Sequence, residues 1–281
     1  MNVRLLGART SGYFCRLGPA LVVALLLGAA APASAQSGGT SSGDWTYELT
    51  PYLWASAMKG DVQAGNLPKT SVDMSFSDVL DVLDFAAMGS FEARKGRWGL
   101  FFDLIYMKLS DSATSTRTGP GPIGATLTTD ANIDIKQTML SGAVMYRVSE
   151  GRSPVDVLGG LRYAKIDASA DINANLFGPG GAGASRTVLR SGDKDWVDPY
   201  VGMRIQHPVA DRWTLMGYAD IGGFGVGSDL TWQVIAGAGY EYSKRVAIKF
   251  GYRYMSVDYD NGGFLYDMRI QGLYAGVGIR F

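Results

Sequence analysis

The sequence predicts an all-β protein, an up-and-down antiparallel β-barrel that crosses a membrane with about ten strands. Three observations predict this fold class. The final stretch, 266–281, alternates apolar residues such as Leu273 with small or polar ones such as Gly276, as the two faces of a strand require. Beyond the N-terminus, apolar residues are spread among 38 Gly and 15 Tyr without long runs. Short polar turns also alternate with longer connections, which is typical of barrels that span membranes.

The N-terminus has the three parts of a secretory signal peptide. Basic residues come first, the apolar run 20–31 follows, and small residues end at Ala35. The run is shorter than the ~20 residues that a membrane-spanning helix needs. We therefore expect 1–35 to be a cleaved signal peptide, 36–44 to be a flexible linker and 45–281 to form one barrel domain.

Cysteine and charge exclude several classes of partner. The only cysteine, Cys15, lies inside the predicted signal peptide, so the mature chain has no thiol for a disulfide or a cysteine metal site. Cleavage removes three Arg and no acid, which leaves 26 − 3 = 23 basic against 26 acidic residues, a net charge of −3. This balance gives no reason to expect a nucleic-acid partner.

Ten strands follow from the alternation and the turns. Tight polar turns such as Lys95-Gly96-Arg97 stand between strands on one side of the predicted barrel. Because the strand number is even, both termini are expected on the periplasmic side. The predicted strands are 45–57, 84–95, 97–110, 131–148, 154–168, 196–207, 212–222, 230–243, 245–258 and 266–281.

The longer connections are predicted to be outer loops, chiefly 112–125 and 172–192. In the first outer loop, Ser75 and Asp78 precede an apolar stripe, which predicts a short capped helix at 77–84. Strand 131–148 is irregular, because Ile133 and Ile135 fall on the opposite face from Leu140. A β-bulge or a protruding outer half of this strand would reconcile them.

Aromatic residues and the last strand suggest how the barrel meets its membrane. Aromatic rings at strand ends beside the short turns are expected to form an interfacial girdle. These residues are Trp45, Trp98, Trp213 and Tyr242. The aromatic C-terminal residue and two alternate apolar residues before it are expected to act as the assembly signal. They are Phe281, Ile279 and Val277.

If the apolar face points to lipid, charged residues of both signs line the lumen. Placing an Arg or Lys on the lipid face instead costs about 2–4 kcal/mol at the midplane. The expected lumen charge network is Glu48, Glu92, Arg94, Asp103, Asp156, Arg162, Asp198, Arg204, Asp220, Glu241, Lys249, Arg253 and Arg280, with Arg147 on the same face. In a ten-strand barrel, matched charges are expected to pair and fill the cross-section. A narrow polar channel is the competing interpretation.

No catalytic or metal site is predicted. The only histidine, His207, lies at a turn on the periplasmic side, which disfavours a serine–histidine or aspartate–histidine catalytic pair. Asp193, Asp195 and Asp198 could offer oxygen ligands to Ca²⁺, but they lack the Gly and Glu of a known calcium loop. Asp258 and Asp260 precede Asn-Gly, which is explained by a hairpin turn. No cofactor is expected.

Five motifs together resemble a family of uncharacterised Gram-negative outer-membrane β-barrel proteins, sometimes labelled porin-like. They are SFSDVLDVLDF (75–85), FEARKGRWGLFFD (91–103), DKDWVDPYVGMR (193–204), DIGGFGVGSDLTWQ (220–233) and GYRYMSVDYD (251–260). The resemblance covers nearly the whole mature chain. It implies the barrel fold and the cell outer membrane, and it brings no activity and no functional residues.

Three functions remain open. The first is a non-enzymatic integral outer-membrane barrel with a structural or narrow-pore role, of which a small-solute porin is the conducting version. The second is an outer-membrane enzyme that processes lipid or peptide, and the third is an adhesin or receptor that uses the outer loops. The expected partners are outer-membrane lipid, lipopolysaccharide and the barrel-assembly machinery, and the oligomeric state is left open.

Overall fold

The computed structural model describes residues 44–64, 69–119, 125–178 and 183–281, and within them the protein is almost entirely β-strand. The predicted signal peptide and most of the linker lie outside the described residues. The elements are β1 (Thr46–Ala64), β2 (Thr70–Met74), α1 (Phe76–Val82), β3 (Leu83–Lys95), β4 (Trp98–Thr118), β5 (Thr126–Ser149), β6 (Val155–Phe177), β7 (Gly183–Ala210), β8 (Trp213–Gly223), β9 (Leu230–Glu241), β10 (Val246–Asn261) and β11 (Phe264–Arg280). Among the described residues no helix is long and apolar enough to cross a membrane.

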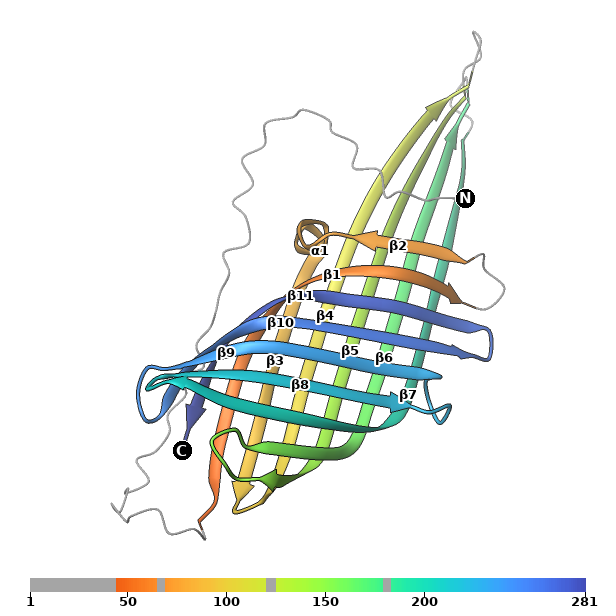
Figure 1. The fold of residues 1–281 in the computed structure, drawn as a ribbon. Coiled ribbons are helices and arrows are strands. Elements are labelled where there is room, and N and C mark those ends of the chain that lie inside the picture. Colours follow the sequence, from red (N-terminus) through yellow and green to blue (C-terminus); the bar gives the residue numbers. More distant parts are fainter. Residues whose placement is uncertain (1–43, 65–68, 120–124, 179–182) are drawn as a thin grey trace.

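The described strands form a closed antiparallel barrel (Figure 1). Eleven strands belong to one sheet, and the pairing of β11 with β1 closes it. β2 pairs only with β1, over five residues, so the ring itself contains 11 − 1 = 10 strands. At the closure, the backbone groups of Tyr47 and Phe281 exchange two hydrogen bonds of 3.2 and 3.1 Å. The predicted up-and-down barrel is therefore confirmed.

The two predicted long loops are wrong as loops, because β-structure continues through most of both. β4 runs to Thr118 and β5 begins at Thr126, and β6 runs to Phe177 before β7 begins at Gly183. These segments are rich in Ser, Thr, Asn and Ala, so successive residues differ little in hydrophobicity. The alternation that predicts a strand is therefore weak there. β3 pairs with β4 only up to Leu109, and β8 pairs with β7 only from Tyr200.

Four strands therefore project beyond the closed ring (Figure 1). We call residues 110–118 of β4, 126–136 of β5, 165–177 of β6 and 183–195 of β7 the extension. At about 3.3 Å per residue, its β5 segment is about 35 Å long. The mismatch of Ile133 and Ile135 with Leu140 is explained by a protruding half-strand, since the pairing of β5 shows no register shift there.

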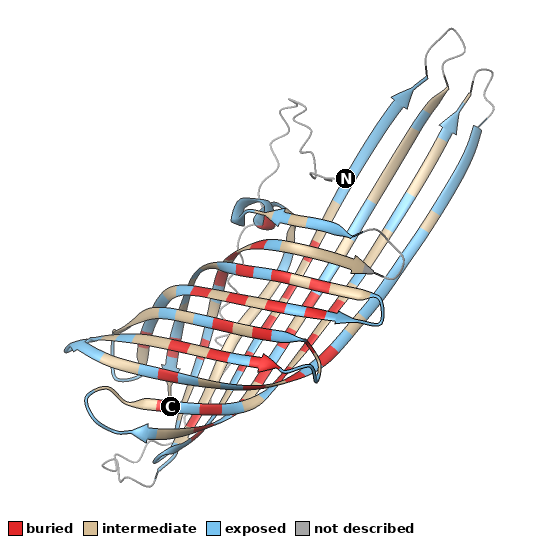
Figure 2. Ribbon diagram, turned by 45° about the vertical axis from the view of Figure 1, so that its right-hand side comes forward, coloured by how far each residue is buried: buried red, intermediate tan, exposed pale blue. Residues whose placement is uncertain are grey.

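The inner face of the barrel wall changes from polar to apolar along the strands. On the ring, alternate residues such as Leu140, Val201 and Leu273 are exposed on the outer surface, as a lipid-facing wall requires. Arg162 and Asp156, which lie on the other face, are buried. Buried positions alternate with exposed ones along the strands of the ring (Figure 2). In the half of the barrel nearer the extension, the interior is instead an apolar core that includes Trp54, Met139, Trp196, Met255, Val257, Tyr259, Met268 and Ile270.

β2 and α1 cover a break in the wall. β1 pairs with β3 only between Thr46 and Pro51, and beyond this point β2 replaces β3 as its neighbour. The predicted helix is confirmed at 76–82, where Ser75 and Asp78 form a capping box. Hydrogen bonds from the Ser75 side chain and backbone hold the pKa of Asp78 below its usual value. Val79 of α1 is buried in the apolar core, so α1 packs where the wall lacks a continuous ladder.

Candidate functional site

The first cluster of the lumen lies near the short turns and is built around Asp156 of β6. Its carboxylate accepts hydrogen bonds from Arg94 Nη2 at 2.9 Å, Arg147 Nε at 2.9 Å and Arg204 Nη2 at 2.8 Å. Arg204 also forms two hydrogen bonds with Glu92, of 2.7 and 3.0 Å. Three arginines from β3, β5 and β7 thus converge on two carboxylates. We call these five residues the turn-end cluster.

A second cluster spans the seam where β11 meets β1. The Glu48 carboxylate accepts a hydrogen bond from Lys249 Nζ and another from Arg280 Nε at 2.8 Å. Arg280 Nη1 donates to Glu241 at 2.9 Å. Because Glu48 and Arg280 are cross-strand partners in the closing ladder, this closing cluster links both ends of the described chain.

Deeper in the lumen, Arg253 of β10 reaches across to β4. Its Nη2 lies 3.0 Å from Asp103, its Nη1 donates to Tyr52 Oη at 2.9 Å, and its Nε donates to Gln233 at 3.0 Å. Tyr52 in turn donates to Asp103 at 2.7 Å. The guanidinium also lies over the ring of Trp54, 5.0 Å from its centroid. Every donor nitrogen of this buried cation therefore has a partner.

Arg162 of β6 makes a matching pair from the other side. Its Nη2 lies 2.8 Å from Asp220, its Nε donates to Ser141 at 3.1 Å, and its guanidinium lies 4.8 Å from the ring centroid of Tyr200. Both side chains of the ion pair are essentially inaccessible to solvent. Gln233 also donates to Asp220, which joins this pair to Arg253. We call Arg162, Arg253 and their partners the arginine layer.

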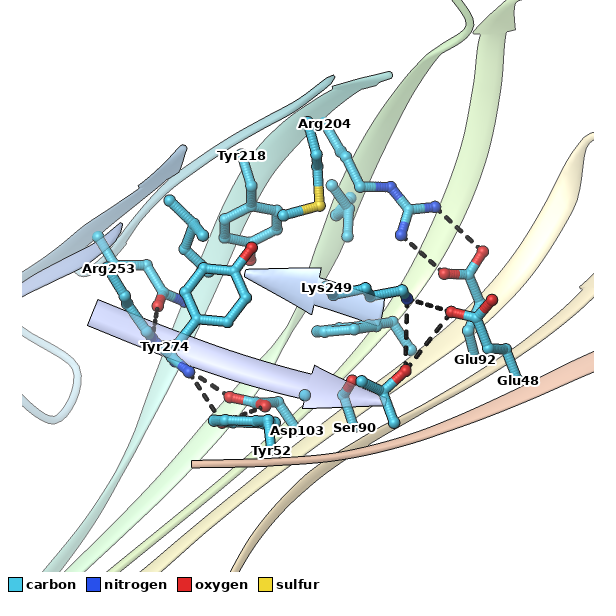
Figure 3. Close-up of a pocket in the computed structure, with 17 residues that line it drawn as sticks. Glu48, Tyr52, Ser90, Glu92, Asp103, Arg204, Tyr218, Lys249, Arg253 and Tyr274 are labelled. Atoms are coloured by element: carbon cyan, nitrogen blue, oxygen red, sulfur yellow. Dashed lines mark hydrogen bonds and ion pairs between the residues drawn. The ribbon is translucent and has the colours of Figure 1, made fainter. Parts of the chain in front are cut away.

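The clusters leave two cavities of different size. One of about 710 Å³ is lined by the turn-end cluster, by the closing cluster and by the turn residues Lys244 and Arg245. A smaller one of about 100 Å³ lies between these clusters and the arginine layer, with Tyr274 and Lys249 at its sides (Figure 3). Beyond the arginine layer the apolar core fills the interior. The cavities therefore become smaller from the turn end toward the arginine layer.

Asp198 departs from the predicted charge network, because its partners are neutral. It accepts hydrogen bonds from the Ser228 backbone at 2.6 Å, Ser228 Oγ at 2.7 Å, Thr231 Oγ1 at 3.0 Å and Trp196 Nε1 at 3.2 Å. No ion pair involves it among the described residues. It ties the β8–β9 loop to β7. Sequence reasoning missed these neutral partners, as it missed Gln233 and Tyr52, because hydroxyl and amide groups carry no charge to match.

The residues considered for catalysis or metal binding are not assembled into such sites. His207 Nδ1 lies 2.6 Å from Ser153 Oγ, but within the described part of the chain no carboxylate orients its other ring nitrogen, as a catalytic triad requires. Asp195 and Asp198 fall on opposite faces of β7. No group of three or more His, Cys, Asp or Glu side chains suited to a metal ion occurs among the described residues.

The predicted girdle and assembly residues lie on the outer surface at the turn end. Trp45, Trp98, Trp213 and Tyr242 are all exposed there, as are Val277, Ile279 and Phe281. The ring of Phe281 stacks on Tyr47 at a centroid distance of 5.7 Å. Their contact with lipid and with assembly machinery remains a prediction.

Comparisons with known proteins agree on the architecture. No protein-family model matches the sequence, and no curated protein matches it either. Among solved structures, the outer membrane protease OmpT from Escherichia coli matches 87% of this chain and 99% of its own length, with a TM-score of 0.52 at 10% identity. The fold is that of the outer-membrane β-barrels.

Two further solved structures have lower TM-scores. The translocator domain of the autotransporter NalP from Neisseria meningitidis has a TM-score of 0.38 at 12% identity and covers 86% of this chain and 90% of its own. Ail, the attachment invasion locus protein of Yersinia pestis, has a TM-score of 0.31 at 12% identity and covers 85% and 99%. At these identities the likeness concerns the fold and carries no activity to this chain.

Proposed function

We propose that this protein is a non-enzymatic, non-conducting barrel of the outer membrane that holds the extension outside the cell. The observation that carries this proposal is the division of the lumen. The arginine layer crosses it, with Arg162 and Arg253 1% and 4% exposed, and the apolar core fills it beyond that layer. A pore selective for ions needs a continuous polar path, often with rings of one charge sign. Here each deep cation is paired with a carboxylate of another strand: Arg253 with Asp103, and Arg162 with Asp220.

The orientation follows from the ends of the barrel. The strand ends near Thr46 and Arg280 lie at the same end as the short turns, while the extension lies at the other. Barrels of this class keep short turns on the periplasmic side and their longer structures outside. The extension therefore faces the exterior, and the 710 Å³ cavity opens toward the periplasm.

A non-enzymatic role is supported by the surroundings of His207. It is the only histidine of the chain, it lies at the turn end, and its one described side-chain hydrogen bond is with Ser153. General acid–base catalysis needs a base within reach of a substrate, and on this orientation His207 is remote from the outer surface.

Planar-bilayer recording on the refolded mature protein tests the closed lumen. We expect no stable conductance steps from protein whose insertion is verified by heat-modifiable gel mobility. Reproducible steps from such protein would contradict the closed lumen and favour the small-solute porin. Processing of lipid or peptide by the purified barrel would contradict the non-enzymatic role.

A further inference from the structure

The extension has the opposite amphipathicity to the half of the ring nearer the short turns. The pairing of β4 to β7 runs through the extension without a register shift, so the face that lines the lumen continues upward as its inner face. This face is polar in the half of the ring nearer the short turns and apolar in the half nearer the extension. On the extension it carries five apolar side chains with exposures between 37% and 44%. They are Leu127, Ile133, Ile135, Ile172 and Leu176.

The outer face of the extension is mainly polar, with Phe177 and Leu189 as its exposed large apolar side chains. Hydrogen bonds join Ser110 to Asp134, Thr114 to Asp130 and Thr187 to Asn173 across it. Single apolar residues scattered over a surface are normal, but several exposed on one face indicate a contact surface. The five apolar residues of the extension share its inner face.

Charge is also divided between the two faces. The inner face carries four cations and one acid, a balance of 4 − 1 = +3: Arg117, Arg186, Arg190 and Lys194 against Asp111. The outer face carries six acids and two cations, a balance of 2 − 6 = −4. The acids are Asp130, Asp134, Asp167, Asp171, Asp193 and Asp195, and the cations are Lys136 and Lys165. An anionic partner is thus attracted to the inner face and repelled by the outer one.

The spacing of the cations indicates the shape of the partner. Arg186, Arg190 and Lys194 repeat every fourth residue along β7, so neighbours are about 13 Å apart on one edge of the apolar face. A single head group would meet only one of them, whereas an elongated chain with repeated acids would meet all three. Arg186 and Arg190 make no ion pair among the described residues. Residues 183–196 of β7 pair only with β6, so this edge is also open.

A second copy of this chain fits the inner face poorly. The inner face of the extension continues the lumen-facing side of the ring. Two copies in the same membrane could therefore place these faces against each other only if their barrels occupied the same space. On a facing membrane, the copy would be turned end over end, which lays β7 over β7. The cations of the two copies would then oppose each other, which is unfavourable.

We propose that the inner face of the extension is the docking surface for an acidic, amphipathic polypeptide of another protein. Its apolar side chains cover the five exposed residues of β5 and β6, and its carboxylates pair with the cation row of β7. The extension projects beyond the closed ring (Figure 1), so this face is open and suits a polypeptide better than a small ligand, whose sites are concave. This inference rests on the proposed exterior position of the extension.

The test uses the full mature protein in lipid nanodiscs and two synthetic peptides. Both peptides have leucine and alanine on one helical face, and the other face is glutamate in one and lysine in the other. We expect the glutamate peptide to bind at least tenfold more tightly than the lysine peptide. The double substitution Arg186→Glu with Arg190→Glu should reverse that preference. Ser185→Glu with Thr187→Glu, on the outer face of the same strand, should leave it unchanged.

Equal affinity for the two peptides, or a preference unaffected by Arg186→Glu with Arg190→Glu, would overturn the proposal. Arginine-dependent binding of oleate without binding of the glutamate peptide would also overturn it, in favour of an anionic lipid. Bilayer recordings of the same variants separate this result from the closed lumen, because none of the four substituted positions lies inside the ring.

Discussion

Asp156→Asn should be the most destabilising single polar substitution in the turn-end cluster. The Asp156 side chain is 1% exposed, and its two oxygens receive hydrogen bonds from Arg94, Arg147 and Arg204. Asparagine keeps the size of the side chain but removes the charge, and its amide group presents hydrogens to a guanidinium. Arg94 and Arg204 would then share Glu92, and Arg147 would lose the carboxylate that it pairs with in this cluster.

The size of the effect follows from burial. Breaking a buried pair by removing one partner costs about 3–5 kcal/mol, since the remaining charge is left without compensation. Glu241→Gln provides the matched control, because Glu241 and its partner Arg280 have side chains 43% and 41% exposed. An exposed pair of this kind contributes less than about 1 kcal/mol.

The assay is urea unfolding of the mature protein in lipid vesicles, followed by tryptophan fluorescence. We expect Asp156→Asn to lower the free energy of unfolding by about 3–5 kcal/mol. Adding Arg147→Gln should restore part of the loss, because it removes one of the uncompensated cations. A loss for Asp156→Asn no greater than that for Glu241→Gln would refute the reasoning.

Three further predictions concern the fold. Deleting Phe281 should lower the amount of assembled barrel far more than the amount synthesised, measured by heat-modifiable gel mobility; unchanged assembly would contradict the terminal signal. Ser75→Ala should destabilise α1 by about 1 kcal/mol and speed amide exchange there. Since the pKa of Asp78 is lowered by folding, its contribution to α1 is present at neutral pH and is lost as the pH falls through that lowered value. Protection of the α1 amides, relative to the unfolded chain at the same pH, that does not fall in acid would contradict it. Gly272→Val should disrupt the closing ladder, because a Cβ there would lie 1.9 Å from the Ala55 carbonyl oxygen. Gly159→Val should be tolerated, because a Cβ at that position would have no atom within 4 Å. Equal unfolding midpoints for the two variants would contradict this.

The sequence was most informative where side chains alternate with strong contrast. Leu273 and Ile279 against Arg280 predict both the strand and its lipid-facing side, because charge on the lipid face is costly. The capping box at Ser75 was readable because it depends on residues three apart in the chain. The extension was not readable, since its outer face consists mostly of charged residues together with Ser, Thr and Asn, and its inner face is partly Ala.

The sequence by itself therefore determined the fold class, the facing of the strands and which charged residues enter the lumen. Only the tertiary structure decided their partners, because Arg204 meets Glu92 across a ring whose curvature and stagger are not encoded in any one strand. It also decided that the lumen-facing side is polar near the short turns and apolar near the extension, where the outer face becomes mainly polar. Local alternation specifies a face, but closure of the ring decides whether that face meets lipid, water or the opposite wall.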